Sequence, residues 1–227
     1  MTLSSIPSGK QRGGCVAIIG AGAAGLMAAV FAARGGVRTL LLERTHGGGK
    51  KILISGGGRC NILPATLDER RFVTDSSFNS MRKMLRGWPL AAQRRFFEED
   101  LDLPLVEEEG TAKLFPVTQR ARDVYERLRE AGRRAGVEFQ GNSFVEELRP
   151  VAGGWDVQLS EGPALRCDRV IVATGGCSIP KTGSDGSGFA FARACDIPPA
   201  LGCVVTPPEV SPSRARAISR CIPSIPR

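Results

Sequence analysis

The first apolar stretch of the chain predicts a strand, a turn and a helix, followed by a second strand. Residues 15–33 contain no charged side chain. Their length and hydropathy would suit a membrane span. However, glycines divide them into a β-rich part, CVAII, and an alanine-rich part that ends near Gly35-Gly36. We therefore expect a buried strand and a buried helix, and no membrane segment. The apolar run VRTLLLE then predicts a second strand that ends at Glu43.

Helical spacing of apolar residues recurs in the middle of the chain. Residues 76–99 predict two short amphipathic helices divided at the GWP sequence, because glycine and proline end helices. Residues 119–135 predict a further helix, which Gly136 ends. The apolar VEF that follows predicts a parallel strand, which is the expected return of a βαβ unit.

The later part of the domain predicts a small antiparallel sheet and one long apolar strand. Three short apolar segments, FVEELRPV, WDVQLS and ALRCD, are separated by glycine-containing turns and predict a three-stranded meander. The segment RVIVATGG, residues 169–176, then predicts a central parallel strand that is covered on both faces and ends in a glycine turn.

A GxGxxG motif connects the first strand to the first helix. The string alone is common, but its place between a strand and a helix is typical of a dinucleotide-binding unit. The first glycine permits a tight turn, the second lets the backbone approach a pyrophosphate, and the third lets the helix pack on the strand. The helix N-terminus supplies free N–H groups to the phosphates. The predicted contacts are Gly20, Ala21, Gly22, Ala23, Ala24 and Gly25.

Glu43 stands at the end of the second predicted strand, where an acidic side chain can accept hydrogen bonds from ribose hydroxyls. An acid at this place favours FAD or NAD over NADP. The alternative is a tight turn in a buried βα unit without a ligand. Packing alone does not require Glu43, which favours the nucleotide.

A second glycine-rich stretch follows Arg44 and reads THGGGKKILISGGGRCN. It is too rich in glycine to predict a helix and longer than an ordinary connection. The apolar residues Ile52–Ile54 argue against disorder. Long ordered loops of this kind often carry function.

Several segments together resemble one protein family. They are IIGAGAAGLMAA, LLLER, GKKILISGGGRCN, KLFPVTQRARDV, VIVATGG and PKTGSDGSGFAFA. They resemble the BaiN/RdsA-type NAD(P)/FAD-dependent oxidoreductases, also called the aminoacetone oxidase family, over residues 15–195. The resemblance implies an α/β fold: a glutathione-reductase-like Rossmann-type FAD-binding domain with a parallel sheet and a three-stranded β-meander, incomplete in this chain.

The resemblance implies FAD as the cofactor, with NAD(P)H as a candidate reductant. The main chain of Ser55–Gly58 would lie against the flavin, since glycine has no Cβ. Arg59 would place positive charge near the flavin or a phosphate, and Val145 would present its backbone to the adenine. Cys60 is interpreted as a small packed residue in preference to a redox thiol. The predicted contacts beyond the first motif are Glu43, Arg44, Lys51, Ser55, Gly56, Gly57, Gly58, Arg59, Cys60, Asn61, Val145, Ala173, Thr174, Gly175 and Gly176.

Charge and cysteine content narrow the range of partners. The net charge is +8, but most of it comes from the two ends of the chain, while Arg and Glu alternate in the interior. Basic tails alone give only nonspecific attraction, so we expect a small-molecule substrate and no nucleic acid. The seven cysteines form no CxxC pair, and His46 is the single histidine, which argues against structural zinc. Free thiols suit the cytoplasm.

The two ends of the chain depart from the family pattern. Residues 1–14 have no apolar core and predict a disordered leader. Residues 196–227 are rich in proline and predict a disordered tail unrelated to the family. The family's second, substrate-facing domain and its final FAD-closing segment are absent, which suggests a truncated or frameshifted product. Asp185 and Ser187 stand where the family more often has Thr and Asp.

The function favoured by the sequence is that of an FAD-dependent oxidoreductase, with flavin-mediated hydride transfer between NAD(P)H and an unknown small organic substrate or acceptor. One alternative is a non-catalytic truncated fragment that binds at most the ADP part of FAD, so whether the chain is itself an enzyme stays open. A second alternative, an NAD-only dehydrogenase, is disfavoured by the meander and by SGGGRCN. No catalytic residue and no oligomeric state follow from the sequence.

Overall fold

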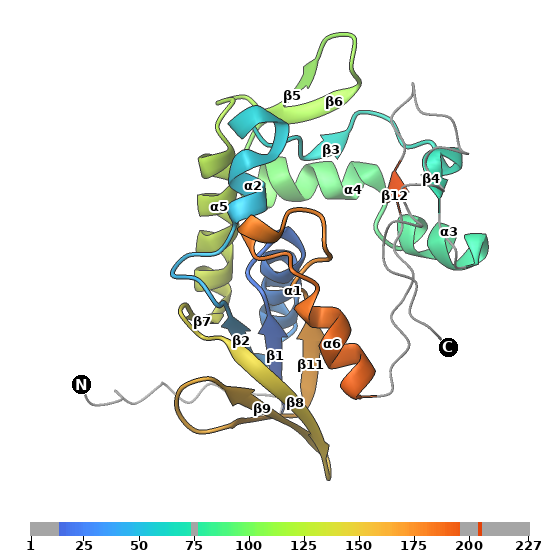
Figure 1. The fold of residues 1–227 in the computed structure, drawn as a ribbon. Helices are drawn as coiled ribbons and strands as arrows, with labels where there is room; N and C mark the ends of the chain where they lie inside the picture. Colours follow the sequence, from blue (N-terminus) through green and yellow to red (C-terminus); the bar gives the residue numbers. More distant parts are fainter. Residues whose placement is uncertain (1–13, 74–76, 196–203, 206–227) are drawn as a thin grey trace. The chain divides into compact units, whose positions relative to one another are not determined.

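The computed structural model describes residues 14–73, 77–195 and 204–205. Most of the predicted leader and most of the predicted tail lie outside these residues. The described chain forms two compact units (Figure 1). The first unit contains residues 14–54 and 124–195, and the second contains residues 55–123 with 204–205.

The first unit is built on a parallel sheet with the strand order β11-β1-β2-β7. Strand β1 (Cys15–Ile19) pairs with β2 (Arg38–Leu42) on one side and with β11 (Arg169–Val172) on the other. Strand β7 (Glu138–Gln140) extends the sheet beyond β2. The four strands run side by side in Figure 1. The predicted βαβ unit and its parallel return strand are confirmed.

Helices α1 (Ala23–Arg34) and α5 (Ala121–Ala135) precede β2 and β7 respectively. The two helices lie beside each other, since a Cβ on Gly132 of α5 would come within 4.0 Å of the Val30 side chain of α1. The apolar stripe on α5 is buried, and the helix ends before Gly136, whose φ of +88° suits glycine. The predicted helix and its end are confirmed.

The predicted meander is present as a three-stranded antiparallel sheet. Its strands are β8 (Val145–Val151), β9 (Gly154–Leu159) and β10 (Leu165–Cys167), in the order β10-β9-β8. Alternate residues of the parallel sheet pack with the meander and with α6 (Ser187–Ala194), because successive side chains of a strand point to opposite faces. The shared buried cluster contains Ala17, Ile19, Leu40, Leu42, Val145, Leu148, Val157, Cys167 and Phe191.

Strand β11 differs from the prediction. We expected a central strand covered on both faces, whereas β11 is an edge strand among the described residues. The side chains of Ile171 and Val172 are 38% and 42% exposed. Apolar character identified the strand correctly, but it could not show whether another element covers the strand.

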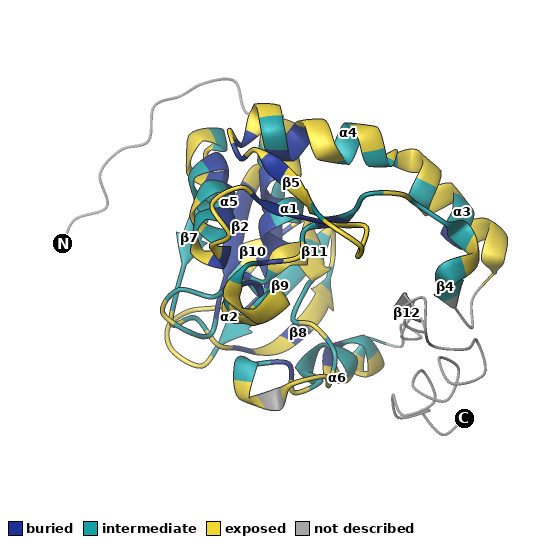
Figure 2. Ribbon diagram, turned by 90° about the horizontal axis from the view of Figure 1, so that it is seen from above, coloured by how far each residue is buried: buried dark blue, intermediate teal, exposed yellow. Residues whose placement is uncertain are grey.

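The second unit is smaller and less regular. It contains the antiparallel sheet β3-β6-β5, formed by Leu63–Pro64, Lys113–Pro116 and Leu105–Glu108. The two predicted amphipathic helices are α3 (Phe78–Gly87) and α4 (Leu90–Arg95), separated by Trp88-Pro89 as expected. Both helices are largely exposed (Figure 2).

The sequence did not predict the β3-β6-β5 sheet or helix α6, and two further short elements were also not expected. Residues 50–54 form a helix, α2 (Lys50–Ile54), although the surrounding glycines argued against one. Its five residues contain no glycine, so the local sequence permits one helical turn. Strand β12 (Val204–Val205) pairs with β4 (Phe72–Val73), inside a region for which we predicted no strand.

The fold predicts opposite effects for two buried helical glycines. A Cβ on Gly25 would lie 1.8 Å from the Gly20 carbonyl oxygen, whereas a Cβ on Gly132 would meet only ordinary contacts at 3.6 to 4.0 Å. We expect Gly25→Ala to lower the free energy of unfolding by about 2 kcal/mol or more, and Gly132→Ala to raise it by roughly 0.5 kcal/mol. Urea unfolding of both variants checks this. Equal stabilities of the two variants would contradict it.

Candidate functional site

The first and third glycines of the GxGxxG motif are required by the packing of the protein itself. Gly20 has φ +100°, and a Cβ there would lie 2.8 Å from the Ala173 carbonyl oxygen. Gly25 lies against the Gly20 carbonyl, as described above. These close approaches hold the first turn of α1 against the ends of β1 and β11. Both glycines would therefore be needed with or without a ligand.

Gly22 is different, because nothing in the described protein requires glycine there. Its φ of −78° is ordinary, and a Cβ would meet no atom within 4 Å. Gly22 is the N-cap of α1, where no side chain caps the helix and no acid occupies the first turn. Ala23 and Ala24 are exposed beside it. The N-terminus of α1 thus presents bare backbone N–H groups to open space.

Ala21 and Glu43 form a buried connection within the motif. The Ala21 N–H donates to Glu43 Oε2 over 2.8 Å, and Ala21 is fully buried. The other carboxylate oxygen, Oε1, accepts from the N–H and the hydroxyl of Thr45 at 2.8 and 2.7 Å. A carboxylate offers about four acceptor positions, so roughly one stays available on Glu43.

The loop after β11 returns to the same place. The Ala173 N–H donates to Ile19 O over 2.8 Å, which continues the pairing of β11 with β1. Gly175 has φ +82°, and a Cβ there would lie 2.9 Å from Lys51 Nζ and 2.7 Å from Ser184 Oγ. Lys51 also donates a hydrogen bond to the buried Ser184. Lys51 therefore lies beside the loop of residues 173–176, and we predicted cofactor contacts for both.

Arg44 is held by Asp185, one of the two positions that depart from the family pattern. Two guanidinium nitrogens of Arg44 lie 2.6 and 2.5 Å from Asp185 Oδ2. The other oxygen of Asp185 accepts from the Ser187 N–H at the start of α6. Burial raises the pKa of Asp185, but the Ser187 hydrogen bonds and the Arg44 charge outweigh it, so the pKa lies below its usual range. Asp185 is therefore an ionised partner of Arg44.

The start of β8 lies beside the loop that follows β2. Ser143 N–H donates to Glu43 O over 2.8 Å, and Asn142 N–H donates to Thr45 O over 3.0 Å. Val145 follows directly and is buried at the edge of the meander. The predicted residues of the first unit come from four separate parts of the sequence, and they lie on neighbouring loops or at the ends of the helices and strands beside these loops.

The predicted residues Ser55–Asn61 belong to the second unit. Gly56, Gly57 and Gly58 all have positive φ, so the backbone makes a left-handed turn that favours glycine. A Cβ on Gly56 would lie 2.8 Å from a ring carbon of Phe115, whereas a Cβ on Gly57 would meet nothing within 4 Å. Asn61 is exposed. Here too one glycine is required by packing and another faces open space.

Arg59 forms hydrogen bonds with this turn and with strand β5 of the second unit. It donates to Gly56 O over 3.1 Å and to Glu108 Oε1 over 2.6 Å, and its guanidinium stacks 4.3 Å from the Phe115 ring centroid. The hydrogen bond from Arg59 is the main reason that the pKa of Glu108 is lowered. The positive charge predicted at Arg59 is thus present and paired with Glu108.

Cys60 is a packed residue, as interpreted from the sequence. It is 7% exposed, and burial raises the pKa of its thiol to about 11. A thiol with this pKa carries little thiolate at neutral pH, so it is a poor nucleophile. Cys60 can contribute its backbone to a ligand, but its chemistry does not suit a redox role.

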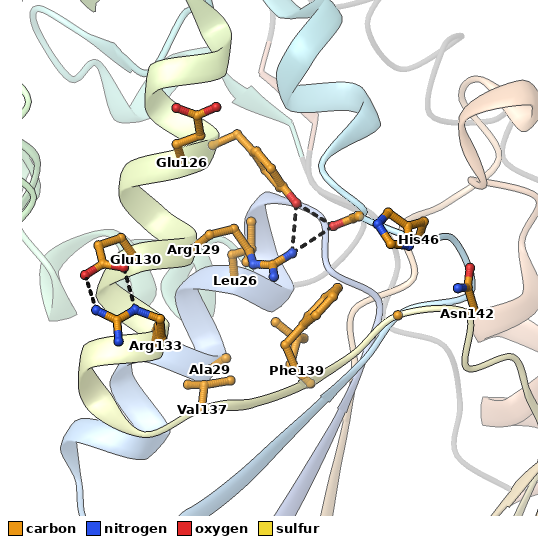
Figure 3. Close-up of a pocket in the computed structure, with 15 residues that line it drawn as sticks. Leu26, Ala29, His46, Glu126, Arg129, Glu130, Arg133, Val137, Phe139 and Asn142 are labelled. Carbon is orange, nitrogen blue, oxygen red and sulfur yellow. Dashed lines mark hydrogen bonds and ion pairs between the residues drawn. The ribbon is translucent and has the colours of Figure 1, made fainter. Parts of the chain in front are cut away.

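A cavity of about 760 Å³ lies in the first unit, lined by residues of α1, β2, α5 and β7 and by adjoining loops (Figure 3). None of the predicted cofactor-binding residues lines it. Leu26, Ala29 and Phe139 supply apolar surface, while His46 and Arg129 supply polar groups. This cavity is therefore not the place where the predicted residues meet.

A family model described as the HI0933-like protein Rossmann domain matches residues 15–208. The chain belongs to this family. The resemblance to BaiN/RdsA-type proteins and the predicted Rossmann-type FAD-binding fold are confirmed, and the family is one of FAD-binding oxidoreductases. The matched region ends at residue 208, whereas we placed the end of the family domain at residue 195.

Similar proteins are known in other organisms. A 3-dehydro-bile acid delta(4,6)-reductase of Clostridium scindens is 35% identical over 182 residues, which is 79% of this chain and 43% of the relative. A ribosomal RNA dihydrouridine synthase of Escherichia coli is 29% identical, over 78% of this chain and 43% of the relative. The chain thus spans less than half the length of these relatives. A solved 3-ketosteroid-delta4-(5alpha)-dehydrogenase from Rhodococcus jostii RHA1 matches with a TM-score of 0.47 at 20% identity, covering 71% of this chain and 45% of that one.

In the part of the chain that the structure describes, no helix has the length and apolar character needed to cross a membrane. Within the same residues, no group of three or more His, Cys, Asp or Glu side chains is arranged to hold a metal ion. The cytoplasmic location stays a prediction.

Several residues that organise the site were missed from the sequence. Thr45, Ser184 and Glu108 hold predicted residues in place, and Tyr125 of α5 contacts the loop at Gly47–Gly49. Helical periodicity placed Tyr125 on a helix. Nothing local in the sequence relates it to a loop so far away along the chain.

The burial of the thiols predicts their reactivity. Cys177 is exposed, whereas burial raises the pKa of Cys60 to about 11, and burial with the neighbouring Cys15 thiol raises that of Cys167 to about 12. We expect iodoacetamide at pH 8 to modify Cys177 first and to leave the other two intact, because a thiol of pKa about 11 is only about one part in a thousand thiolate. Peptide mass mapping measures this, with urea-unfolded protein as the control. Equal rates at Cys60 and Cys177 in the native protein would contradict it.

Proposed function

We propose that this chain binds FAD and serves an FAD-dependent oxidoreductase, in which the flavin links oxidation of NAD(P)H to reduction of a small organic substrate. The observation that carries the proposal is the contrast among the three motif glycines. Gly20 and Gly25 are explained by packing, but Gly22 borders open space at an uncapped helix N-terminus. A pyrophosphate needs such a place, because a Cβ would block its approach to the N–H groups.

The surrounding residues fit the other parts of the cofactor. The acceptor position that stays available on Glu43 suits a ribose hydroxyl, and an acidic side chain there favours a ribose without a 2′-phosphate. The backbone of residues 142–145 runs beside Glu43, which suits contact with the adenine. Lys51 and Arg44 supply positive charge near the loop 173–176.

The second unit, taken by itself, presents bare backbone at Gly57 and the exposed side chain of Asn61, which suit the flavin contacts that the family resemblance implies. Flavin, when bound, supplies hydride transfer, and the protein positions it and tunes its electron affinity. The chain's residues therefore bind and orient. We assign no acid or base. Asp185, whose pKa is lowered, is already paired with Arg44.

The names of the relatives suggest a reaction class. A delta(4,6)-reductase and a dihydrouridine synthase, by name, both add hydrogen to an unsaturated ring. We propose the same class here, with hydride transfer to a carbon–carbon double bond. The 35% identity to the bile acid reductase favours a small molecule, and the expectation that no nucleic acid binds stays a prediction.

A second candidate function is cofactor binding without catalysis. It is favoured by the exposed edge strand β11, with Ile171 and Val172 at 38% and 42% exposure. Such a chain would hold the ADP part of FAD and would not reduce an acceptor with NAD(P)H.

The spectrum of the purified chain tests both candidates. We expect a yellow protein that releases FAD on heating. Gly22→Val should weaken FAD binding more than tenfold, because its side chain fills the space beside the N–H groups. Gly87→Val is the matched control, since a Cβ at Gly87 also meets nothing within 4 Å but lies in α3, far along the chain from every predicted contact.

Dissociation constants for FAD and ADP come from titration of the apo-protein. ADP binding without flavin reduction by NAD(P)H would identify the second candidate. Neither FAD nor ADP binding by the wild-type chain would refute both.

A further inference from the structure

The glycine loop, residues 45–49, contains three consecutive glycines that the cofactor contacts above do not use. We propose that Tyr125 of α5 is a positioning residue that holds this loop against the GxGxxG turn and thereby fixes the pyrophosphate-binding N–H groups. This inference rests on the proposed function for the identity of the ligand. That Tyr125 holds the glycine loop in place follows from contacts within the first unit alone and does not depend on the ligand.

The Tyr125 side chain meets the glycine loop with both its ring and its hydroxyl. The hydroxyl donates to the Gly47 carbonyl oxygen over 2.5 Å. The ring lies directly on Gly49, where a Cβ would come within 2.3 and 2.5 Å of two ring carbons. Gly49 has φ +67° and is buried. Glycine at position 49 is therefore required by an aromatic ring of the protein and not by a ligand.

Arg129, one turn further along α5, completes the attachment. Its Nη1 donates to Tyr125 Oη over 2.9 Å and to Gly47 O over 3.2 Å, as the dashed lines in Figure 3 show. Its guanidinium also stacks on the Phe139 ring of β7, 3.6 Å from the ring centroid. The hydroxyl of Tyr125 thus both donates and accepts, which fixes its orientation.

The opposite side of the glycine loop lies on Ala21 of the GxGxxG turn. Gly49 N–H donates to Ala21 O over 2.9 Å. A Cβ on Gly48 would lie 2.8 Å from the Ala21 Cβ and 3.2 Å from Glu43 Cγ. The loop is therefore one residue thick between the Tyr125 ring and Ala21, and only glycine fits in the gap.

Ala21 transmits this contact to the phosphate-facing residues. Its N–H is bonded to Glu43 and its carbonyl to Gly49, and Gly22 is the next residue in the chain. A glycine-rich loop loses much conformational entropy when it is fixed, so it does not hold its shape alone. Tyr125 supplies the contacts that hold the loop in shape. When its side chain is removed, the turn at Ala21 should become more mobile than any strand of the parallel sheet.

Two variants of Tyr125 test the inference. Tyr125→Phe removes the hydroxyl and keeps the ring, and Tyr125→Leu removes both. Phe31→Leu is the matched control, because it replaces an exposed aromatic residue on α1 of the same unit. The first measurement is amide hydrogen exchange in the apo-protein, at the N–H groups of Ala21 and Gly49. The second is the dissociation constant for FAD and for ADP.

We expect exchange at both amides to accelerate at least tenfold in Tyr125→Leu and by a smaller factor in Tyr125→Phe, while exchange in the meander is unchanged. The dissociation constants should rise more than tenfold in Tyr125→Leu and about fivefold in Tyr125→Phe, because the second variant keeps the ring and loses only the hydrogen bonds of the hydroxyl. Phe31→Leu should change neither quantity. A role in general stability alone would accelerate exchange throughout the sheet, and the partial recovery in Tyr125→Phe would then be absent.

Each contrary result would refute one specific part of the inference. Unchanged exchange at Ala21 and Gly49 in both variants would refute the attachment of the loop. Faster exchange with unchanged FAD and ADP affinity would refute the positioning role. If Tyr125→Leu fails to fold, Tyr125→Phe still decides both points. If the wild-type chain binds neither nucleotide, the proposed function and the coupling to it are refuted, while the exchange rates still decide the attachment.

Discussion

The first turn of α1 approaches the ends of β1 and β11 so closely that no side chain fits between them. The 1.8 Å gap between the Cβ position of Gly25 and the Gly20 carbonyl, and the 2.8 Å gap between the Cβ position of Gly20 and Ala173 O, set this distance. Because the helix begins so near the sheet, its N-terminal N–H groups emerge at the edge where β1, β2 and β11 end. The loops that follow these strands meet there for the same reason.

The order of elements in the first unit followed from the sequence because each element has a long or well-bounded pattern. The strand–glycine–helix–strand run, the stripe on α5 and the three strands of the meander are all visible locally. The exposure of β11, the helical turn of α2 and helix α6 were missed. An apolar strand carries no local sign of what covers it, and a helix of one turn is too short to show a period.

The sequence also predicted which loops carry the site, but it did not predict the packing role of each glycine. GxGxxG and SGGG appear uniform as strings. In the structure, Gly20, Gly25 and Gly56 are required by atoms of the protein, whereas Gly22 and Gly57 border open space. Such a difference depends on contacts between residues far apart in the chain, such as Gly56 with Phe115. The same holds for Arg44 with Asp185, a pair that no local pattern could reveal.

The three predicted cationic side chains share a property that bears on how an anionic cofactor is accommodated. Arg44 is paired with Asp185, Arg59 with Glu108, and Lys51 is bonded to Ser184. Both ion pairs are between about a third and two-fifths exposed on each side, and pairs of this kind contribute little net stability. Their value lies in geometry, because a charged side chain that is already oriented loses less entropy on binding. A phosphate near Arg44 would need to share the guanidinium with Asp185 and would not need to break a strong bond, so positive charge stays available while the loops keep their shape.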